Sequence, residues 1–514
     1  MASEALTPSA VNRWVLLVCV MFGGFMMVLD NNITSVSLPY IMATLGADIE
    51  QVQWVASGFM IAATASMPLT HWLGRRLGYG NLYIYALMAF TAGAALSASS
   101  WSLETLIVAR VLQGVGSGVV QPTGITLLTR AFPRSMRGRA LGFNSVGVML
   151  APTFGPTLAG VLIDLFGWRA NYTMSTGVGL LALLLASSVL SREKEEPPGA
   201  FDWWGYFSLI ILLVCGLLTV ANGPRVGWGE EPIVLGMAVA ATALMVLLVV
   251  EWQVRHPILP IHLLRVGDLS LALFLTLYKA LARLGGNFLL PIFLSRVQNR
   301  NPVEIGLLMM PGPIWNSICN PIAGLFTDKV GGKWLAVASG FAIGAYLWLY
   351  HGLDPLSTAW AIVMPQFFRG LGIAMIDAPV VTTGMNAVPR DETSNASWMF
   401  TLMLRIGSVL SISMMSTYLQ RQISVQREHL AGSPLGSDPP AEAWVRENRR
   451  LGLTEADARS AARSVANRQI TVYATARAFQ NLYVVAGLVG LSAVIPALFL
   501  RGRRTPPPAR AAAA

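Results

Sequence analysis

The chain has 514 residues, of which 54% are hydrophobic and only 12% are charged. Ordinary soluble domains carry roughly 25% charged residues, so this composition indicates an integral membrane protein and excludes disordered and collagen-like chains. Three cysteines exclude a disulfide scaffold. The net charge of +10 does not indicate nucleic-acid binding, because the basic residues lie in loops between apolar runs.

The apolar runs predict an all-α membrane protein with 14 transmembrane helices. Roughly 20 apolar residues cross the hydrocarbon core as a helix. The expected spans are 12–36, 52–73, 80–99, 103–129, 138–162, 171–190, 203–222, 232–252, 269–294, 303–327, 333–350, 357–383, 395–419 and 476–500. The first span is too long for a signal-peptide core and no small-residue cleavage site follows it, so we expect it to stay in the membrane.

Basic residues in the short loops predict the orientation of the chain. With the N-terminus in the cytoplasm, the inner segments hold 18 Lys and Arg residues and the short outer loops hold 4. Both termini are then cytoplasmic, which requires an even number of spans. The alternative is an odd number of spans, with one span missed.

One long loop, residues 420–475, is expected outside the membrane. It contains three prolines and then a charged helical stretch near 441–468. Two interpretations remain open for it, namely a solvated cap and a docking surface for a partner protein.

An internal repeat divides the chain. Residues 68–78 align with 321–331 at an offset of 253, and Gln113–Gly116 aligns with Arg369–Gly372 at an offset of 256. The offset of 256 also relates Ala131–Arg134 to Ala387–Arg390. Spans 1–6 therefore repeat in parallel as spans 9–14, and spans 7–8 are an insert.

The repeat predicts the domain organisation. We expect an N-terminal six-helix bundle over 12–190, an inserted two-helix hairpin over 203–252 and a C-terminal six-helix bundle over 269–500. A basic, Ala- and Pro-rich cytoplasmic tail follows over 501–514. Parallel six-helix repeats around a central cavity imply transport by alternating access.

A carboxylate lies inside the first span, because Asp30 is surrounded by apolar residues and followed by Asn31 and Asn32. A charge at this depth is costly unless it is paired, hydrated or protonated. Asp30 is therefore a candidate proton carrier or a contact for a cationic substrate. The alternative is a structural hydrogen-bond anchor near the membrane face.

Further charges lie in the later spans. Lys279 and Arg283 are four residues apart and share one face of the ninth span. Arg369 and Asp377 are separated by about 12 Å of helical rise and cannot pair directly. We expect Asp377 to meet Lys279, Arg283 or Arg405 across the cavity. This group is either a buried ion-pair network or a polar site for an anionic or zwitterionic substrate head.

Enzyme motifs are absent from the sequence. It contains no His-Glu-x-x-His, no Walker A motif and no Gly-x-Ser-x-Gly elbow. The five histidines are scattered, so we expect neither a metal site nor a cofactor, and no enzymatic activity. Without a nucleotide site, transport must be driven by an ion gradient.

Short motifs connect the spans in a recognisable order. They are Leu29-Asp30 with Leu38-Pro39, Trp54-Val55, Arg110-Val-Leu-Gln-Gly114, Gly155-Pro156 and Gly167-Trp168-Arg169. In this order and spacing the chain resembles the major facilitator superfamily, in its fourteen-span drug:proton antiporter branch of the EmrB/QacA type. Through residues 54–78 and the segment Leu451-Gly-Leu-Thr454 it is most similar to EmrB-like permeases.

The resemblance implies roles for individual residues. Arg110, with Gln113 on the same helix face, is expected to tune the proton-accepting carboxylate Asp30. The antiporter signature of exporters falls on Gly147, Gly155 and Pro156. A gating motif falls on Gly324, Asp328, Lys329, Gly331 and Lys333, where Asp328 is expected to pair with basic residues of neighbouring inner loops. The first copy of that motif departs from the pattern, with His71 and Arg75 at two of its positions.

These observations predict a proton-coupled exporter of lipophilic small molecules in a bacterial inner membrane. The resemblance also implies a periplasmic adaptor protein and an outer-membrane channel as partners. A dedicated translocase for lipids, fatty acids or other amphiphilic anions is the alternative, and a non-transporting membrane receptor is a weaker one. The candidate cavity residues are Asn31, Asn32, Gln113, Gln121, Lys279, Arg283, Arg369, Asp377 and Arg405.

Overall fold

The computed structural model describes residues 13–190, 199–254, 257–431 and 454–501. A few side chains inside these ranges, including that of Pro156, also lie outside the description. Every element in the described ranges is helical. The first half of the chain contains α1 (Arg13–Leu45), α2 (Ile49–Ser66), α3 (Leu69–Leu77), α4 (Tyr79–Ala98), α5 (Leu103–Ala131), η1 (Arg134–Met136), α6 (Arg137–Phe166) and α7 (Arg169–Val189).

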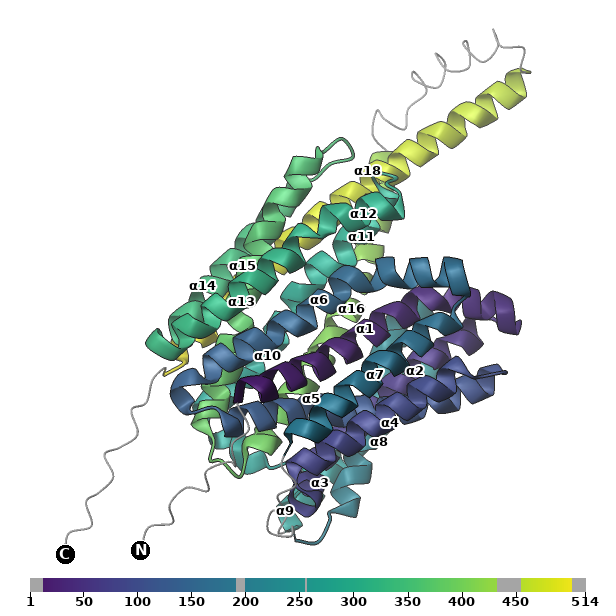
Figure 1. Ribbon diagram of the computed structural model, residues 1–514. Coiled ribbons are helices and arrows are strands. Elements are labelled where there is room, and N and C mark those ends of the chain that lie inside the picture. The colour runs from purple at the N-terminus through teal and green to yellow at the C-terminus, as the bar shows by residue number, and fades with distance from the viewer. Residues whose placement is uncertain (1–12, 191–198, 255–256, 432–453, 502–514) are drawn as a thin grey trace, which may run out of the picture.

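Two inserted helices follow, α8 (Trp203–Val226) and α9 (Glu231–Gln253). The second half contains η2 (Ile261–Arg265), α10 (Gly267–Leu284), the π-helical segment η3 (Gly285–Leu289), α11 (Leu290–Arg296), α12 (Pro302–Met309), α13 (Pro311–Val330), α14 (Lys333–His351), α15 (Ala359–Ala387), α16 (Thr393–Ala431), α18 (Glu455–Ser492) and α19 (Val494–Phe499). The described chain begins and ends at the same end of the helical bundle (Figure 1).

Hydropathy supports a multi-pass membrane protein. Within the described residues, nine helices are long and apolar enough to cross a membrane, or eleven if two bent helix pairs each count as one span. The expected spans outside this set are 269–294, 303–327 and 333–350. The helices of two of these spans carry charged side chains, such as Lys279 in α10 and Asp328 in α13. Hydropathy along a single helix therefore does not establish the expected count of 14.

The pattern of helix packing repeats between the two halves. In the first half α5 packs against α2 and α4, α1 packs against α6, and α4 packs against α7. In the second half α15 packs against α13 and α14, α10 packs against α16, and α14 packs against α18. Each of these four contacts of the first half thus has a counterpart in the second, in the same order along the chain.

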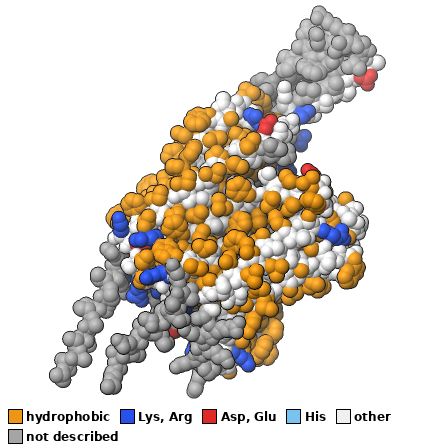
Figure 2. Space-filling model, in the orientation of Figure 1, with side chains coloured by type: hydrophobic (Ala, Val, Ile, Leu, Met, Phe, Trp, Pro, Cys, Tyr) orange, Lys and Arg blue, Asp and Glu red, His pale blue; other side chains and the backbone are white. Residues whose placement is uncertain are grey.

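The inserted helices bridge the two halves at the periphery. Helix α8 packs against α9, and it also contacts α2 and α16. Large apolar side chains on this hairpin face outward, including Trp204 and Trp252. Figure 2 shows hydrophobic side chains over the middle of one face of the molecule, with Lys and Arg gathered near the end where the chain begins and ends. Apolar surface of this extent is stable against lipid.

The expected outer loop over 420–475 is largely helical at both of its ends. Helix α16 continues to Ala431, and α18 begins at Glu455 and extends beyond the bundle (Figure 1). The helices thus continue past the expected spans 395–419 and 476–500, because a helix satisfies its own backbone hydrogen bonds and can continue after its apolar residues end. Residues 432–453 between these helices, which include most of the 451–454 segment, and the tail 502–514 lie outside the described residues.

The two halves make their tightest contact where α6 crosses α13. A side-chain carbon at Gly324 would lie 2.2 Å from the backbone oxygen of Gly138, and one at Gly142 would lie 2.7 Å from the oxygen of Asn320. Only glycine allows the two backbones to approach this closely. The crossing lies at the end where α1 begins, because the Trp14 ring packs against Phe132 and Phe143 there. The two halves are therefore closed together at this end.

Replacing Gly324 with alanine should separate the halves at this end, because the added methyl group overlaps the α6 backbone. Overpacking of this kind costs roughly 1–3 kcal/mol. Pulsed electron paramagnetic resonance between spin labels at Ser135 and Lys329, both exposed, should show longer distances in the variant. The control is Gly160→Ala in α6, where an added methyl group meets no atom within 4 Å. Equal distance distributions in G324A and in the parent protein would contradict this role of the glycine contact.

Candidate proton and substrate sites

Asp30 lies at the centre of a buried polar cluster that joins three helices. Its side chain and that of Arg110 are both 0% exposed. Arg110 Nη1 donates to Asp30 Oδ2 at 2.6 Å, Gln113 Nε2 donates to Oδ1 at 2.8 Å, and Ser175 Oγ donates to Oδ1 at 2.9 Å. The carboxylate is thereby bound to α5 and α7 as well as to its own helix, α1. The three groups all have a hydrogen to donate to the carboxylate oxygens.

Close packing of α5 holds Arg110 in place. A side-chain carbon at Gly114 would lie 2.4 Å from the backbone oxygen of Phe59, so α5 approaches α2 closely. This approach places the Arg110 guanidinium over the Phe59 ring, 4.2 Å from its centroid, and lets Nε donate to the Val55 carbonyl. The small-residue face of α5 therefore fixes the position of the arginine.

The second half repeats this cluster without its carboxylate. Arg369 on α15 donates to Gln366 Oε1 at 2.8 Å and to Asn287 Oδ1. Gln366 and Arg369 stand 256 residues after Arg110 and Gln113, so the arginine and glutamine have exchanged positions. Asn287 takes the place of Asp30 in this arrangement. An amide does not titrate, so this copy holds no acidic side chain that could carry a proton.

A cavity lies between α5 and α6 of the first half and α10, α15 and α16 of the second. Among its lining residues are Gln121, Lys279, Arg283 and Asp377. Lys279 Nζ lies 2.5 Å from Asp377 Oδ1, and Arg283 Nη2 lies 3.1 Å from Asp377 Oδ2. The predicted pairing of Asp377 with the cations of span nine is confirmed.

The other candidate cavity residues lie elsewhere. Asn31 is exposed on α1, and Asn32 donates to the Val28 carbonyl at 2.6 Å. Gln113 belongs to the Asp30 cluster and Arg369 to its second-half copy. Arg405 is half-buried on α16, and no contact with Asp377 is found for it within the described ranges. Hydropathy identified these polar side chains, but it does not give the rotation of each helix about its axis, so it could not show which of them face the cavity.

The signature glycines of α6 face α1. A side-chain carbon at Gly147 would lie 3.1 Å from the Met21 carbonyl, and one at Gly155 would lie 3.1 Å from Asn32 Cβ. The side chain of Pro156 lies outside the description. These glycines therefore let α1, which carries Asp30, pack closely along α6, which in turn crosses α13.

Asp328 holds the N-terminus of α6. It accepts the backbone N–H of Gly138 at 2.8 Å and that of Arg139 at 3.0 Å, while the Arg139 side chain lies 3.9 Å away. Sequence reasoning expected side-chain pairing alone, but backbone N–H groups at a helix N-terminus attract an anion directly. Of the remaining motif residues, Gly331 has a φ of 90° and ends α13, and Lys333 Nζ lies over the Trp334 ring. Lys329 is exposed.

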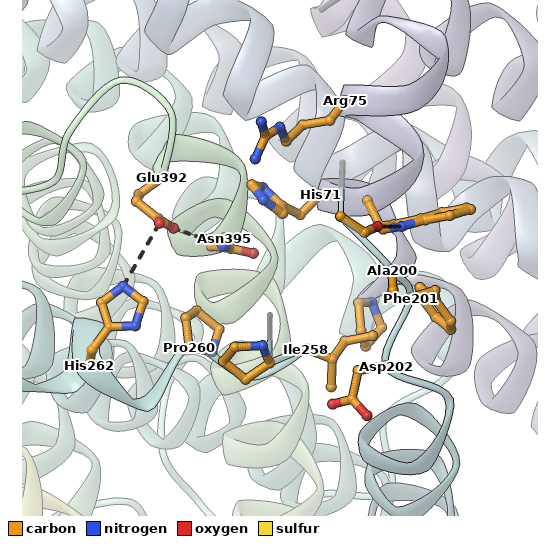
Figure 3. A pocket seen from close by; sticks show the side chains of 14 residues that line it. His71, Arg75, Ala200, Phe201, Asp202, Ile258, Pro260, His262, Glu392 and Asn395 are labelled. Atoms are coloured by element: carbon orange, nitrogen blue, oxygen red, sulfur yellow. Dashed lines mark hydrogen bonds and ion pairs between the residues drawn. The ribbon is translucent and has the colours of Figure 1, made fainter. Parts of the chain in front are cut away.

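A second contact between the halves surrounds a pocket at the same end. In Figure 3, His71 and Arg75 of α3 face Glu392 and Asn395, which lie at the start of α16. Asn395 donates to Glu392 at 2.7 Å, and His262 lies 3.8 Å from the same carboxylate. Arg75 occupies the place that Asp328 has in the repeat, and the acidic residue lies across the pocket from it. In the first contact between the halves Asp328 supplies the negative charge from the motif position, whereas in this second contact the equivalent position holds the positive charge of Arg75.

Three residues of the two polar clusters were missed by sequence reasoning. They are Ser175, Asn287 and Gln366. A single serine in an apolar helix carries no signal, and Asn287 lies in a π-helical segment that hydropathy does not reveal. Gln366 could have been found, because the repeat offset places it opposite Arg110.

Comparison with known proteins identifies the family. The model of the Major Facilitator Superfamily matches residues 20–412. The chain is 28% identical to the multidrug export protein EmrB of Haemophilus influenzae, over 84% of this chain and 85% of that relative. It is 26% identical to EmrB of Escherichia coli K12, over 93% of this chain and 94% of that relative. The human organic anion transporter MFSD10 shares the fold, with a TM-score of 0.55 at 12% identity, covering 94% of this chain and 100% of the other.

The chain therefore belongs to the Major Facilitator Superfamily, whose members are membrane transporters rather than enzymes. The similarity to EmrB-like permeases predicted from the sequence motifs is confirmed. The protein is thus a multi-pass membrane protein.

A double-mutant cycle on Asp30 and Arg110 should show strong coupling. Arg110→Gln leaves a buried carboxylate without its cation, which costs roughly 3–5 kcal/mol. Asp30→Asn removes that charge as well, so the double variant should unfold at a higher temperature than R110Q alone. Thermal unfolding followed by tryptophan fluorescence measures this difference.

The control is the ion pair of Arg300 and Glu304, in which both side chains are exposed. The cycle R300Q/E304Q should show coupling of about 1 kcal/mol or less. Additive effects of R110Q and D30N would contradict a tight ion pair at Asp30.

Proposed function

We propose that this protein exports lipophilic small molecules in exchange for protons, with Asp30 as the proton carrier. The observation that carries the proposal is the cluster of Asp30 with Arg110, Gln113 and Ser175. It is buried, charged and connected to three helices, which is the arrangement in which one proton changes the packing of a bundle. The second-half copy has an amide in place of the carboxylate, which supports Asp30 as the carrier.

The packing suggests how protonation reaches the gate. A proton on Asp30 removes the negative charge that holds Arg110, and it weakens the bonds from α5 and α7 to α1. Helix α1 packs along the glycine face of α6, and the N-terminus of α6 is held by Asp328 of α13. We propose that these contacts transmit the change at Asp30 to the closed end, where the two halves then separate.

The proposed membrane arrangement has 14 spans and both termini in the cytoplasm of a bacterial cell. The six-helix bundles 12–190 and 269–500 lie on either side of the cavity, and the hairpin 203–252 contacts both of them at the periphery. The common end at which the described chain begins and ends supports an even number of spans. The three more polar spans would keep their charges inside the bundle, away from lipid.

Export and broad selectivity are supported by the relatives named as multidrug export proteins. Methionine and aromatic side chains in the cavity wall, such as Met149 and Phe400, can adapt to varied ligands. An adaptor protein and an outer-membrane channel are proposed as partners, with the extended ends of α16 and α18 as the contact region. A dedicated translocase of amphiphilic anions is the second candidate, favoured by the two cations in the cavity.

Proton flux in liposomes tests the proposal. Purified protein is reconstituted with an internal pH dye, a proton gradient is imposed, and lipophilic cations and anions are added in turn. The parent protein should show substrate-induced proton flux, and Asp30→Asn should lose it at least tenfold, since the amide cannot take up a proton. Asp164→Asn, which alters an exposed carboxylate on α6, should keep it. Substrate movement without proton flux in the parent protein would contradict the proposal.

A further inference from the structure

The charges that line the cavity do not balance. Lys279 and Arg283 are cationic and Asp377 is anionic, whereas the other lining side chains are polar and neutral or apolar. With all three groups ionised, the wall carries a net charge of +1. One carboxylate is thus shared between two cations, at 2.5 Å and 3.1 Å.

A structural ion pair alone does not explain this arrangement. A buried carboxylate requires one cation, and a second cation in a low-dielectric site is costly unless an anion accompanies it. Neighbouring polar residues such as Gln121 and Thr401 supply no charge. The second cation therefore indicates that an anion enters from outside the chain.

Arg283 is the member of the cluster that can meet such an anion. Its side chain is 22% exposed, whereas those of Lys279 and Asp377 are below one tenth. Arg283 uses Nη2 for its contacts with Asp377 and with the sulfur of Met149. Within the described residues, no hydrogen bond is found for its Nε or Nη1. A planar guanidinium whose Nε and Nη1 nitrogens can both still donate suits a carboxylate, sulfonate or phosphate group.

The rest of the wall suits a lipophilic body. Val148, Met149, Phe400 and Leu404 line the same cavity, on helices α6 and α16. A molecule with an anionic head at Arg283 would place its apolar part against these side chains. A cation of the same shape would raise the net charge of the site to +2.

We infer that the central cavity selects lipophilic substrates carrying a single negative charge, with Arg283 binding the head group. This inference rests on the proposed transport function and names its substrate class. The loaded cavity is then electrically neutral, which lowers the cost of holding these charges within the membrane.

Binding of two ions of the same shape and opposite charge tests the inference. Tetraphenylborate and tetraphenylphosphonium are measured by equilibrium dialysis against the full-length protein in lipid nanodiscs, and binding to empty nanodiscs is subtracted. The parent protein should bind the borate more tightly. Arg283→Gln should lower the ratio of the two affinities about tenfold or more, because a close charge pair is lost in a partly buried site. Arg283→Lys should keep most of the preference for the borate, because it keeps the positive charge.

A second variant keeps the ion pairs intact, in case Arg283→Gln does not fold. Ser145 lines the cavity and is half-buried. Ser145→Asp brings the net charge to zero and should remove the preference for the borate, whereas Ser145→Asn should retain it. The double variant Lys279→Gln/Asp377→Asn keeps a net charge of +1 and should also retain it.

Equal binding of the two ions by the parent protein would overturn the inference, as would an unchanged ratio in both R283Q and S145D. These outcomes are distinguishable from failure of the proposed function. Proton flux that persists without any anion preference contradicts the substrate class alone. An anion preference without Asp30-dependent proton flux contradicts the antiporter.

Discussion

The ion pair between Asp30 and Arg110 constrains much of the first half of this protein. Neither side chain is exposed, and their charged atoms lie 2.6 Å apart. A buried pair is tolerated only where further hydrogen bonds offset its desolvation, and here Gln113, Ser175 and the Val55 carbonyl provide them. Four helices are therefore joined through one pair of charges and its hydrogen bonds.

The two halves share a packing scheme but differ in chemistry. The same helix pairs meet in the same order, and each half places an arginine and a glutamine on the corresponding helix. The first half retains a carboxylate, whereas the second has Asn287 in its place and carries its acidic residue, Asp377, at the cavity. In the proposed cycle the first half thus handles the proton and the second half binds the substrate head.

Much of this arrangement could be predicted from the sequence, because burying a charge in a membrane is so costly that each such residue is informative. Asp30 and the pairing of Asp377 were found in this way, whereas the role of Arg110 came from the resemblance to the family. The repeat offset also predicted equivalent helices, and it would have led to Gln366. Helices α16 and α18 extend beyond the apolar runs of their expected spans, because the end of an apolar run does not end a helix.

The remaining residues could not be predicted, because hydropathy does not give the rotation of a helix. Asn31 and Asp30 are neighbours, yet one is exposed and the other is buried at the centre of a cluster. Ser175 acquires its role only because α7 turns it toward α1. The backbone N–H groups that bind Asp328 carry no sequence signal, since every residue except proline has one.

The central claim is that Asp30 binds and releases the transported proton, and infrared difference spectroscopy of the purified protein tests it most directly. Acidification should produce the carbonyl band of a protonated carboxylic acid, and this band should be missing in Asp30→Asn but present in Asp164→Asn. Adding a transported substrate at constant pH should weaken the band, as the proton leaves. A spectrum in which Asp30→Asn keeps the full band at every pH that supports transport would contradict the account.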